Sequence, residues 1–178
     1  MKTFKTRNDL IKNLPRNLKI CEIGVFKGDF SKILFDQFPN ELHLIDPFIG
    51  EVWSGDKDGS NMRLANLNNA YEEILMMYKE HKNVFVHKGF SQNILENFPD
   101  NYFDFIYIDG DHSYEGVMND LILSKRKTKI DGIISGHDYN NNQFPGVVMA
   151  VNEFCALYNL LINSLTEDNL PTFTIINK

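Results

Sequence analysis

The sequence is poor in several features, and each scarcity excludes a class of protein. Its 178 residues include two cysteines, one tryptophan and six prolines. Cys21 and Cys155 lie far apart between apolar neighbours, which excludes a disulfide-stapled scaffold or a cysteine metal motif and predicts buried thiols. No apolar run is long enough to cross a membrane, and the first residues lack the apolar core of a secretory signal. These absences predict a cytoplasmic protein.

Positive charge is also scarce. The chain has 18 lysines and arginines against 24 acidic residues, a formal net charge of −6. This balance argues against a partner such as nucleic acid or an anionic membrane surface. The one basic cluster, residues 125–129, falls at the end of an expected helix, where cations complement the helix dipole. We therefore interpret it as a solvated helix end and not as a binding patch.

Two kinds of segment alternate along the chain. Short apolar or β-rich runs occupy 18–23, 42–45, 84–87, 103–108 and 132–135, and helical spacing marks 29–38, 65–80, 91–98, 114–128 and 146–158. This alternation predicts a doubly wound α/β fold, with a mostly parallel sheet covered on both faces. Runs at 160–165 and 172–176 around a turn predict an antiparallel carboxy-terminal hairpin. With no repeat or linker to divide the chain, we expect a single domain over residues 1–178.

Polar and glycine residues gather where the first two runs end. Ligands of an open parallel sheet bind outside the carboxyl ends of its strands, and Glu22, Gly24 and Gly28 follow the first run. Asp46 lies about twenty residues further on, where an acid commonly accepts the hydroxyls of a ribose. A dinucleotide is disfavoured, because the pattern G-x-G-x-x-G fails and Glu22 would repel a pyrophosphate. An adenosine with a cationic amino acid portion, as in S-adenosylmethionine, suits these residues better.

A second polar group follows the later runs. Asp109, Asp111 and His112 crowd together in "IDGDH", and His137 and Asp138 follow the next run in "GHDY". Carboxylates beside an apolar core cost free energy unless something pairs with them. The sequence therefore predicts a cation, a base or a ligand at this point.

Several of these motifs together resemble a known family. "CEIGVFKGDFS", "LIDPF", "KGFSQNI", "FDFIYIDGDHSYEGVMNDL" and "GHDY" resemble the successive motifs of class I S-adenosylmethionine-dependent methyltransferases. The specific resemblance, over about residues 18–160, is to the small-molecule O-methyltransferase branch that includes macrocin-type sugar methyltransferases. It implies a Rossmann-like sheet of seven strands with the last antiparallel. It also implies methyl transfer to a hydroxyl of a small molecule, with a sugar or glycoside as the expected acceptor.

The resemblance implies a set of cofactor-binding residues. Glu22 and Gly24 would line the methionine portion and Asp46 would hold the ribose. The adenine would be surrounded by Phe48, Phe90 and Ser91. The whole expected set is Glu22, Gly24, Val25, Gly28, Asp46, Phe48, Phe90, Ser91 and Asp109.

The resemblance also implies a metal site, because metal-dependent members place an acid after the fourth strand and a polar pair after the fifth. Asp109, His137 and Asp138 stand at those positions. A divalent ion such as Mg²⁺, Mn²⁺ or Fe²⁺ there would orient the acceptor and lower the pKa of its hydroxyl. Histidine suits Mn²⁺ or Fe²⁺ better than Mg²⁺. In a metal-free mechanism His112 or His137 would act as general base, so the expected catalytic residues are His112, His137 and Asp109.

Two other functions stay open at this point. A glycosyltransferase could use Asp109 and Asp111 as a D-x-D metal motif, and a non-catalytic module could keep the fold without the chemistry. The acceptor surface would come from residues 47–62 with Trp53, from residues 140–146, or from a second subunit of a homo-oligomer.

Overall fold

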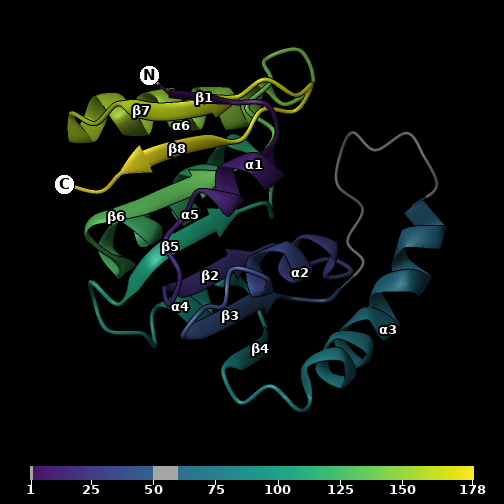
Figure 1. The fold of residues 1–178 in the computed structure, drawn as a ribbon. Coiled ribbons are helices and arrows are strands. Elements are labelled where there is room, and N and C mark those ends of the chain that lie inside the picture. Colours follow the sequence, from purple (N-terminus) through teal and green to yellow (C-terminus); the bar gives the residue numbers. More distant parts are fainter. Residues whose placement is uncertain (1, 50–59) are drawn as a thin grey trace.

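A computed structural model describes residues 2–49 and 60–178, and within them eight strands form one sheet. The strands are β1 (Lys2–Phe4), β2 (Lys19–Ile23), β3 (Glu41–Asp46), β4 (Val84–Lys88), β5 (Phe103–Ile108), β6 (Thr128–Gly136), β7 (Ile162–Thr166) and β8 (Phe173–Ile176). The helices are α1 (Arg7–Lys12), α2 (Asp29–Phe35), α3 (Ser60–Tyr78), α4 (Ser91–Leu95), α5 (Tyr114–Lys127) and α6 (Pro145–Tyr158). Figure 1 shows their arrangement.

The sheet confirms the predicted Rossmann-like architecture and corrects its strand count. The strand order is β1-β7-β8-β6-β5-β2-β3-β4, and only β8 runs antiparallel to its neighbours, β6 and β7. The sheet has eight strands where seven were expected, because β1 pairs in parallel with β7 at the edge. A three-residue strand with two exposed residues carries no apolar alternation, so the sequence pattern could not reveal it.

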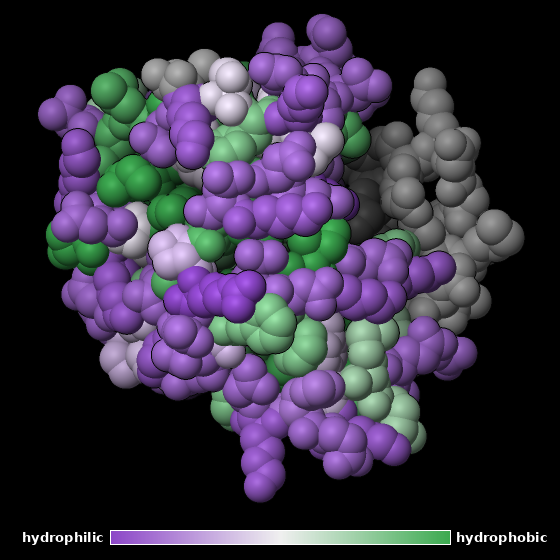
Figure 2. All heavy atoms as spheres, viewed as in Figure 1, coloured by the Kyte–Doolittle hydropathy of each residue, from purple (hydrophilic) through white to green (hydrophobic). Residues whose placement is uncertain are grey.

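One face of the sheet is covered by α1, α2 and α3. Leu10 and Ile11 of α1, Phe30 and Leu34 of α2, and Ile74 of α3 share an apolar cluster with β2, β3 and β5 side chains. In Figure 1, α1 and α2 lie in front of the sheet and α3 stands to the right. Hydrophilic side chains cover most of the surface over α1 and α2 (Figure 2).

The opposite face is covered by α4, α5 and α6. Leu95, Val117 and Phe154 pack there against the other side of β2, β5 and β6. Cys21 and Cys155 belong to the same cluster as buried free thiols, which confirms their predicted burial. The sheet is therefore covered on both faces, which is what the alternation of strands and helices predicted.

The structured amino-terminal segment was not anticipated. The Thr6 hydroxyl accepts the Asp9 N–H at the start of α1, and Leu10 and Ile11 are 3% and 0% exposed. Six residues are too few to show helical periodicity in the sequence, so no pattern predicted α1. A helix this short is stable only because it packs against the sheet beneath it. The helix begins with Arg7 at the carboxyl edge of the sheet, where Arg7 reaches Asp109.

The interpretation of residues 125–129 as a solvated helix end is wrong for Lys127. Lys127 is 3% exposed, and its Nζ donates to the Phe98 carbonyl at 2.7 Å and to Asp100 Oδ1 at 2.8 Å. A buried ammonium is tolerated here because both contacts satisfy it. The cluster thus helps to attach α5 to the segment after α4.

Two further expectations concern the loop at residues 47–62 and the absence of a membrane-spanning segment. Residues 50–59, with Trp53 and most of the segment 47–62, lie outside the described residues. In the described ranges no helix has both the length and the apolar character needed to cross a bilayer.

Candidate functional site

The carboxyl ends of the central strands meet at one edge of the sheet. The backbone ladder continues beyond them, since Gly24 N–H donates to Ile45 O at 2.9 Å and Asp109 N–H donates to Ile23 O at 2.8 Å. His137 N–H likewise donates to Ile108 O at 3.0 Å. Residues from four separate parts of the sequence are thereby held side by side.

Gly24 permits a close backbone contact at this edge. Its φ is +89°, and a Cβ built on it would lie 2.1 Å from the carbonyl oxygen of Asp109. Any side chain would therefore push the turns after β2 and β5 apart. Gly28, at φ +77°, then begins α2 in the left-handed region.

Asp46 ties the turn after β2 to the end of β3. Its Oδ2 accepts the N–H groups of Val25 and Phe26, both at 2.9 Å, and its Oδ1 accepts the N–H of Phe48 at 2.6 Å. Burial raises the pKa of Asp46, and these three N–H groups oppose that rise. A carboxylate accepts about four hydrogen bonds, so acceptor capacity remains for a ligand hydroxyl.

Glu22 lies beneath this edge and not on it. It is 1% exposed, the Ser31 hydroxyl donates to its Oε2, and burial raises its pKa well above the ordinary range. Val25 is also buried, at 3% exposure. The expected contact of Glu22 with the methionine portion, and that of Val25 with the cofactor, therefore stay predictions.

The residues expected around the adenine differ in accessibility. Phe48 is 2% exposed and packs on Tyr71, whereas Phe90 is 49% exposed. The Ser91 hydroxyl donates to Asp120 Oδ1 at 2.5 Å, and burial raises the pKa of Asp120 to about 6. The sequence assigned Asp120 no role, because nothing local shows that α5 places it behind Ser91. The adenine contacts stay predictions.

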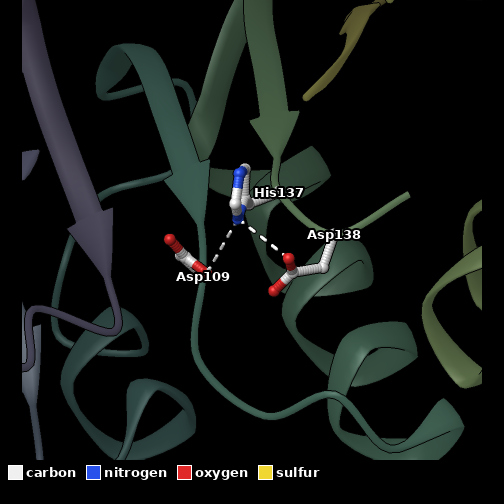
Figure 3. A group of neighbouring side chains, drawn as sticks. All are labelled: Asp109, His137 and Asp138. Atoms are coloured by element: carbon white, nitrogen blue, oxygen red, sulfur yellow. Dashed lines mark ion pairs between the residues drawn. The ribbon is translucent and has the colours of Figure 1, made fainter. Parts of the chain in front are cut away.

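Three expected metal-binding residues do come together. Asp109 follows β5, and His137 and Asp138 follow β6 (Figure 3). His137 Nδ1 lies 3.0 Å from Asp138 Oδ1 and 3.8 Å from Asp109 Oδ1. One potential ligand atom from each residue lies within 4.8 Å of the others. The three side chains could therefore share a single ion.

Asp138 is a buried carboxylate between two imidazoles. It is 5% exposed at φ +60°, and its Oδ2 lies 2.5 Å from His112 Nε2. Its Oδ1 is buried and lies 3.0 Å from His137 Nδ1, but no well-aligned hydrogen bond reaches it within the part of the chain that the structure describes. Although burial raises its pKa, the neighbouring imidazoles of His112 and His137 outweigh that effect and lower it. Asp138 is thus an ionised carboxylate whose buried Oδ1 has His137 as a neighbour but no well-aligned hydrogen bond, which fits a divalent cation shared with His137.

His112 holds Asp138 in place. Its ring lies against Phe144, with 4.6 Å between ring centroids. Burial lowers the pKa of His112, but the hydrogen bond to Asp138 and the Asp138 charge raise it further, so the net shift is upward. For Asp109, burial and the Asp138 charge raise the pKa, while His137 and Arg7 oppose them.

Asp111 points elsewhere. Its Oδ1 accepts the Ser113 N–H at 2.7 Å, just before α5 begins, and Asp111 is not part of the metal-capable group among the described residues. The arrangement therefore gives no support to a D-x-D motif of Asp109 and Asp111.

Arg7 is the site residue that the sequence analysis missed. Its Nη1 lies 3.4 Å from Asp109 Oδ2, and its guanidinium carbon lies 4.6 Å from the centre of the Phe30 ring. Arg7 and Asp109 are 102 positions apart in the chain. No local motif surrounds Arg7, so only the path of the amino-terminal segment over the sheet reveals its place.

Comparison with known proteins gives a family and a fold. Residues 21–139 match the model of a family described as a methyltransferase domain. An uncharacterized protein, R132, of Acanthamoeba polyphaga mimivirus is 27% identical over 164 residues, which are 87% of this chain and 69% of that protein.

Solved structures resemble this fold at low sequence identity. A putative rRNA methylase from Clostridium thermocellum has a TM-score of 0.67 at 14% identity, with all of both chains covered. The N-methyltransferase NodS from Bradyrhizobium japonicum WM9 has a TM-score of 0.63 at 12% identity, covering 96% of this chain and 94% of that one. At such identities the likeness establishes the fold alone.

Proposed function

The chain belongs to the methyltransferase-domain family, and from this premise we propose that it methylates a hydroxyl of a small molecule, with a divalent metal at the strand ends. The family implies S-adenosylmethionine as the cofactor. The observation that carries the proposal is the group of Asp109, His137 and Asp138, in which one potential ligand atom of each residue lies within 4.8 Å of the others and Asp138 offers a buried, ionised oxygen beside His137.

The residues at the ends of β2 and β3 fit the cofactor. Asp46 retains acceptor capacity beside the turn from Val25 to Phe26, which suits the hydroxyls of a ribose. Gly24 keeps the turn after β2 in contact with the backbone of Asp109 after β5, so that the two turns lie side by side at the site. S-adenosylmethionine supplies, when bound, a methyl group on a sulfonium that a hydroxyl oxygen can attack. The protein's contribution is to hold that oxygen in line with the methyl group.

The donor set also fits a divalent cation. Two carboxylates and one imidazole favour Mn²⁺ or Fe²⁺ over Mg²⁺, since magnesium prefers oxygen ligands. Such an ion would lower the pKa of a bound hydroxyl. Asp109 and Asp138 supply negative charge, and His112 fixes the orientation of Asp138 from its far side. In a metal-free mechanism His137 or His112 would instead take the proton of the hydroxyl.

The choice of a small-molecule acceptor has independent support. The formal charge of −6 disfavours a polyanionic acceptor such as RNA. Two carboxylates and two imidazoles at one edge suit a hydroxyl, as in a sugar or glycoside, because they can orient it and accept its proton. The alternative of a glycosyltransferase loses its support with the family match and with the orientation of Asp111. Location in the cytoplasm and assembly into a homo-oligomer stay predictions.

Calorimetric titration with S-adenosylhomocysteine tests the cofactor. Micromolar binding, on the order of −8 kcal/mol, is expected for the native protein, and Asp46→Ala should abolish it. Asp131→Asn is the control, because Asp131 is an exposed acid in the amino-terminal half of β6, away from the strand ends that form the site. Absence of binding by the native protein would refute the proposal.

Turnover tests the acceptor and the metal. Glycosides and catechol-like diols are screened for S-adenosylhomocysteine release, with Mn²⁺ and after treatment with EDTA. Methylation of a hydroxyl that is lost with EDTA and restored by Mn²⁺ supports the proposal. Turnover that EDTA leaves unchanged would exclude a metal from the mechanism and favour His137 or His112 as the general base. Cofactor binding without turnover on any acceptor would favour the non-catalytic module.

A further inference from the structure

Arg7 is a cation placed against the acidic edge by a segment outside the family match, which begins at residue 21. We propose that Arg7 binds the carboxylate of the cofactor's amino acid portion and so selects the intact amino acid over its decarboxylated form. This inference rests on the proposed function, because it requires S-adenosylmethionine as the cofactor. It adds to that function a specificity residue from the amino-terminal segment.

The backbone at Arg7 is held in place by several contacts. Arg7 is the first residue of α1, with Thr6 as the cap, and its N–H lies 3.4 Å from Asp168 Oδ2. Asp168 itself accepts a hydrogen bond from the Thr166 hydroxyl at the end of β7. With Leu10 and Ile11 buried as well, the segment that carries Arg7 is fixed before any ligand binds.

The guanidinium is oriented but not saturated. Its carbon lies over the Phe30 ring at 4.6 Å from the ring centre, and the Arg7 side chain is 31% exposed. Its contact with Asp109 is one long hydrogen bond of 3.4 Å, and it also faces the Tyr107 hydroxyl. A guanidinium has about five N–H donors in a fork that matches a carboxylate, so donors remain for a ligand.

The charges around Arg7 identify the ligand group. S-adenosylmethionine carries two positive groups, the sulfonium and the ammonium, and one negative group, the carboxylate. Asp109, whose Oδ2 faces Arg7, attracts the positive groups, whereas a guanidinium favours only the carboxylate. An arginine beside Asp109 therefore complements the two oppositely charged ends of an α-amino acid. A purely structural ion pair would predict no dependence on the ligand's carboxylate.

Binding of three probes to Arg7→Gln tests this inference. The probes are S-adenosylhomocysteine, its decarboxylated analogue, and 5′-methylthioadenosine, which lacks the amino acid portion. Loss of a charge-assisted contact predicts about 30-fold weaker binding of S-adenosylhomocysteine, or about 2 kcal/mol at 1.4 kcal/mol per tenfold. Binding of the other two probes should change less than about threefold. Arg7→Lys keeps the positive charge and should recover part of the loss.

Arg16→Gln is the matched control, because the Arg16 guanidinium also stacks on a phenylalanine, Phe38, at 4.8 Å. It should leave the binding of all three probes unchanged. Equal weakening of all three probes by Arg7→Gln, or no weakening of any, would overturn the inference while the native protein still bound S-adenosylhomocysteine. Failure of the native protein to bind any probe would instead overturn the proposed function on which the inference rests.

Discussion

Two clusters of similar residues lie in different parts of the sheet. The strand-end cluster (Asp109, His112, His137 and Asp138) lies at the carboxyl ends of β5 and β6, beside Arg7. The aromatic cluster (Glu41, His43, His87, Phe98 and Tyr102) lies along β3 and β4 and before the amino end of β5. Each combines two histidines with carboxylate and a neighbouring cation, so residue type alone does not separate a site from a structural network.

The aromatic cluster is a satisfied network. His43 Nδ1 lies 3.0 Å from His87 Nε2, and His43 Nε2 lies 3.2 Å from Glu41 Oε2. The other oxygen of Glu41 pairs with Lys19 Nζ at 2.8 Å, and the Tyr102 hydroxyl also donates to Glu41. Burial lowers the pKa of both histidines, that of His87 to about 4.

The strand-end cluster differs in its carboxylates. It has two acids for two histidines, which raises the pKa of His112, and the buried Oδ1 of Asp138 has His137 at 3.0 Å but no well-aligned hydrogen bond among the described residues. A buried carboxylate oxygen with a poorly aligned partner costs free energy in the folded chain. The comparison teaches that satisfaction of the acids, and not the presence of histidines, distinguishes the candidate site.

The largest effect is expected from Gly24→Ala, which disturbs the backbone contact that positions Asp109 in the strand-end cluster. A methyl group 2.1 Å from Asp109 O, at φ +89°, should lower the free energy of unfolding by at least about 3 kcal/mol. Urea unfolding measures this loss. Gly110→Ala is the control, since its Cβ would meet atoms only at 3.6 to 3.9 Å, and it should cost less than about 1 kcal/mol. Equal stability of the two variants would contradict the contact.

The next largest effect is expected on Mn²⁺ affinity, which should differ between matched variants of the two clusters. Asp138→Asn should weaken Mn²⁺ binding at least about 100-fold, because it removes the ionised oxygen that the proposed ion would use. Glu41→Gln makes the matching change in the aromatic cluster and should leave Mn²⁺ affinity unchanged. Free Mn²⁺ measured by electron paramagnetic resonance gives both values. The assignment fails if the two variants bind Mn²⁺ equally well.

A smaller effect is expected on the stability of the folded chain at acidic pH, through His87 of the aromatic cluster. A histidine whose pKa falls from 6.5 to about 4 on folding binds its proton more readily when unfolded. Stability should therefore fall as the pH drops from about 6.5 towards 4. The His87 contribution is about 1 to 2 kcal/mol, after discounting for its partial exposure.

Urea unfolding at several pH values measures this slope. His87→Gln should flatten it between pH 6.5 and 4. His81→Gln is the control, because His81 is exposed and lies outside the cluster. An unchanged slope in the His87 variant would show that His87 does not titrate in this window.

The smallest effect is expected from Tyr102→Phe. It removes the hydroxyl that donates to Glu41 but keeps the ring against Phe98 and Phe103. Loss of one hydrogen bond should cost about 1 kcal/mol of stability, measured by thermal unfolding. Affinity for S-adenosylhomocysteine should not change, because Tyr102 belongs to the opposite end of the sheet. A matching loss of affinity would mean that the two clusters are coupled.

The sequence by itself determined the order of the central strands and helices and the polar residues that follow them. Apolar runs, helical spacing and glycines are local signals, so β2 to β6, α2 and α5 could be expected within a few residues of their bounds. The convergence of Asp109, His137 and Asp138 also followed, since the resemblance made their strands neighbours.

Only the tertiary structure decided which of those residues are satisfied and which are not. The burial of Glu22, the bond from Ser91 to Asp120 and the position of Arg7 over Asp109 join segments from 9 to 102 residues apart. Such contacts depend on how β1 and α1 cross the sheet and how α5 packs beneath it, and no local pattern encodes either. The physical reason is that hydrophobic periodicity specifies which face of an element is buried, whereas its polar contacts depend on the neighbour it meets.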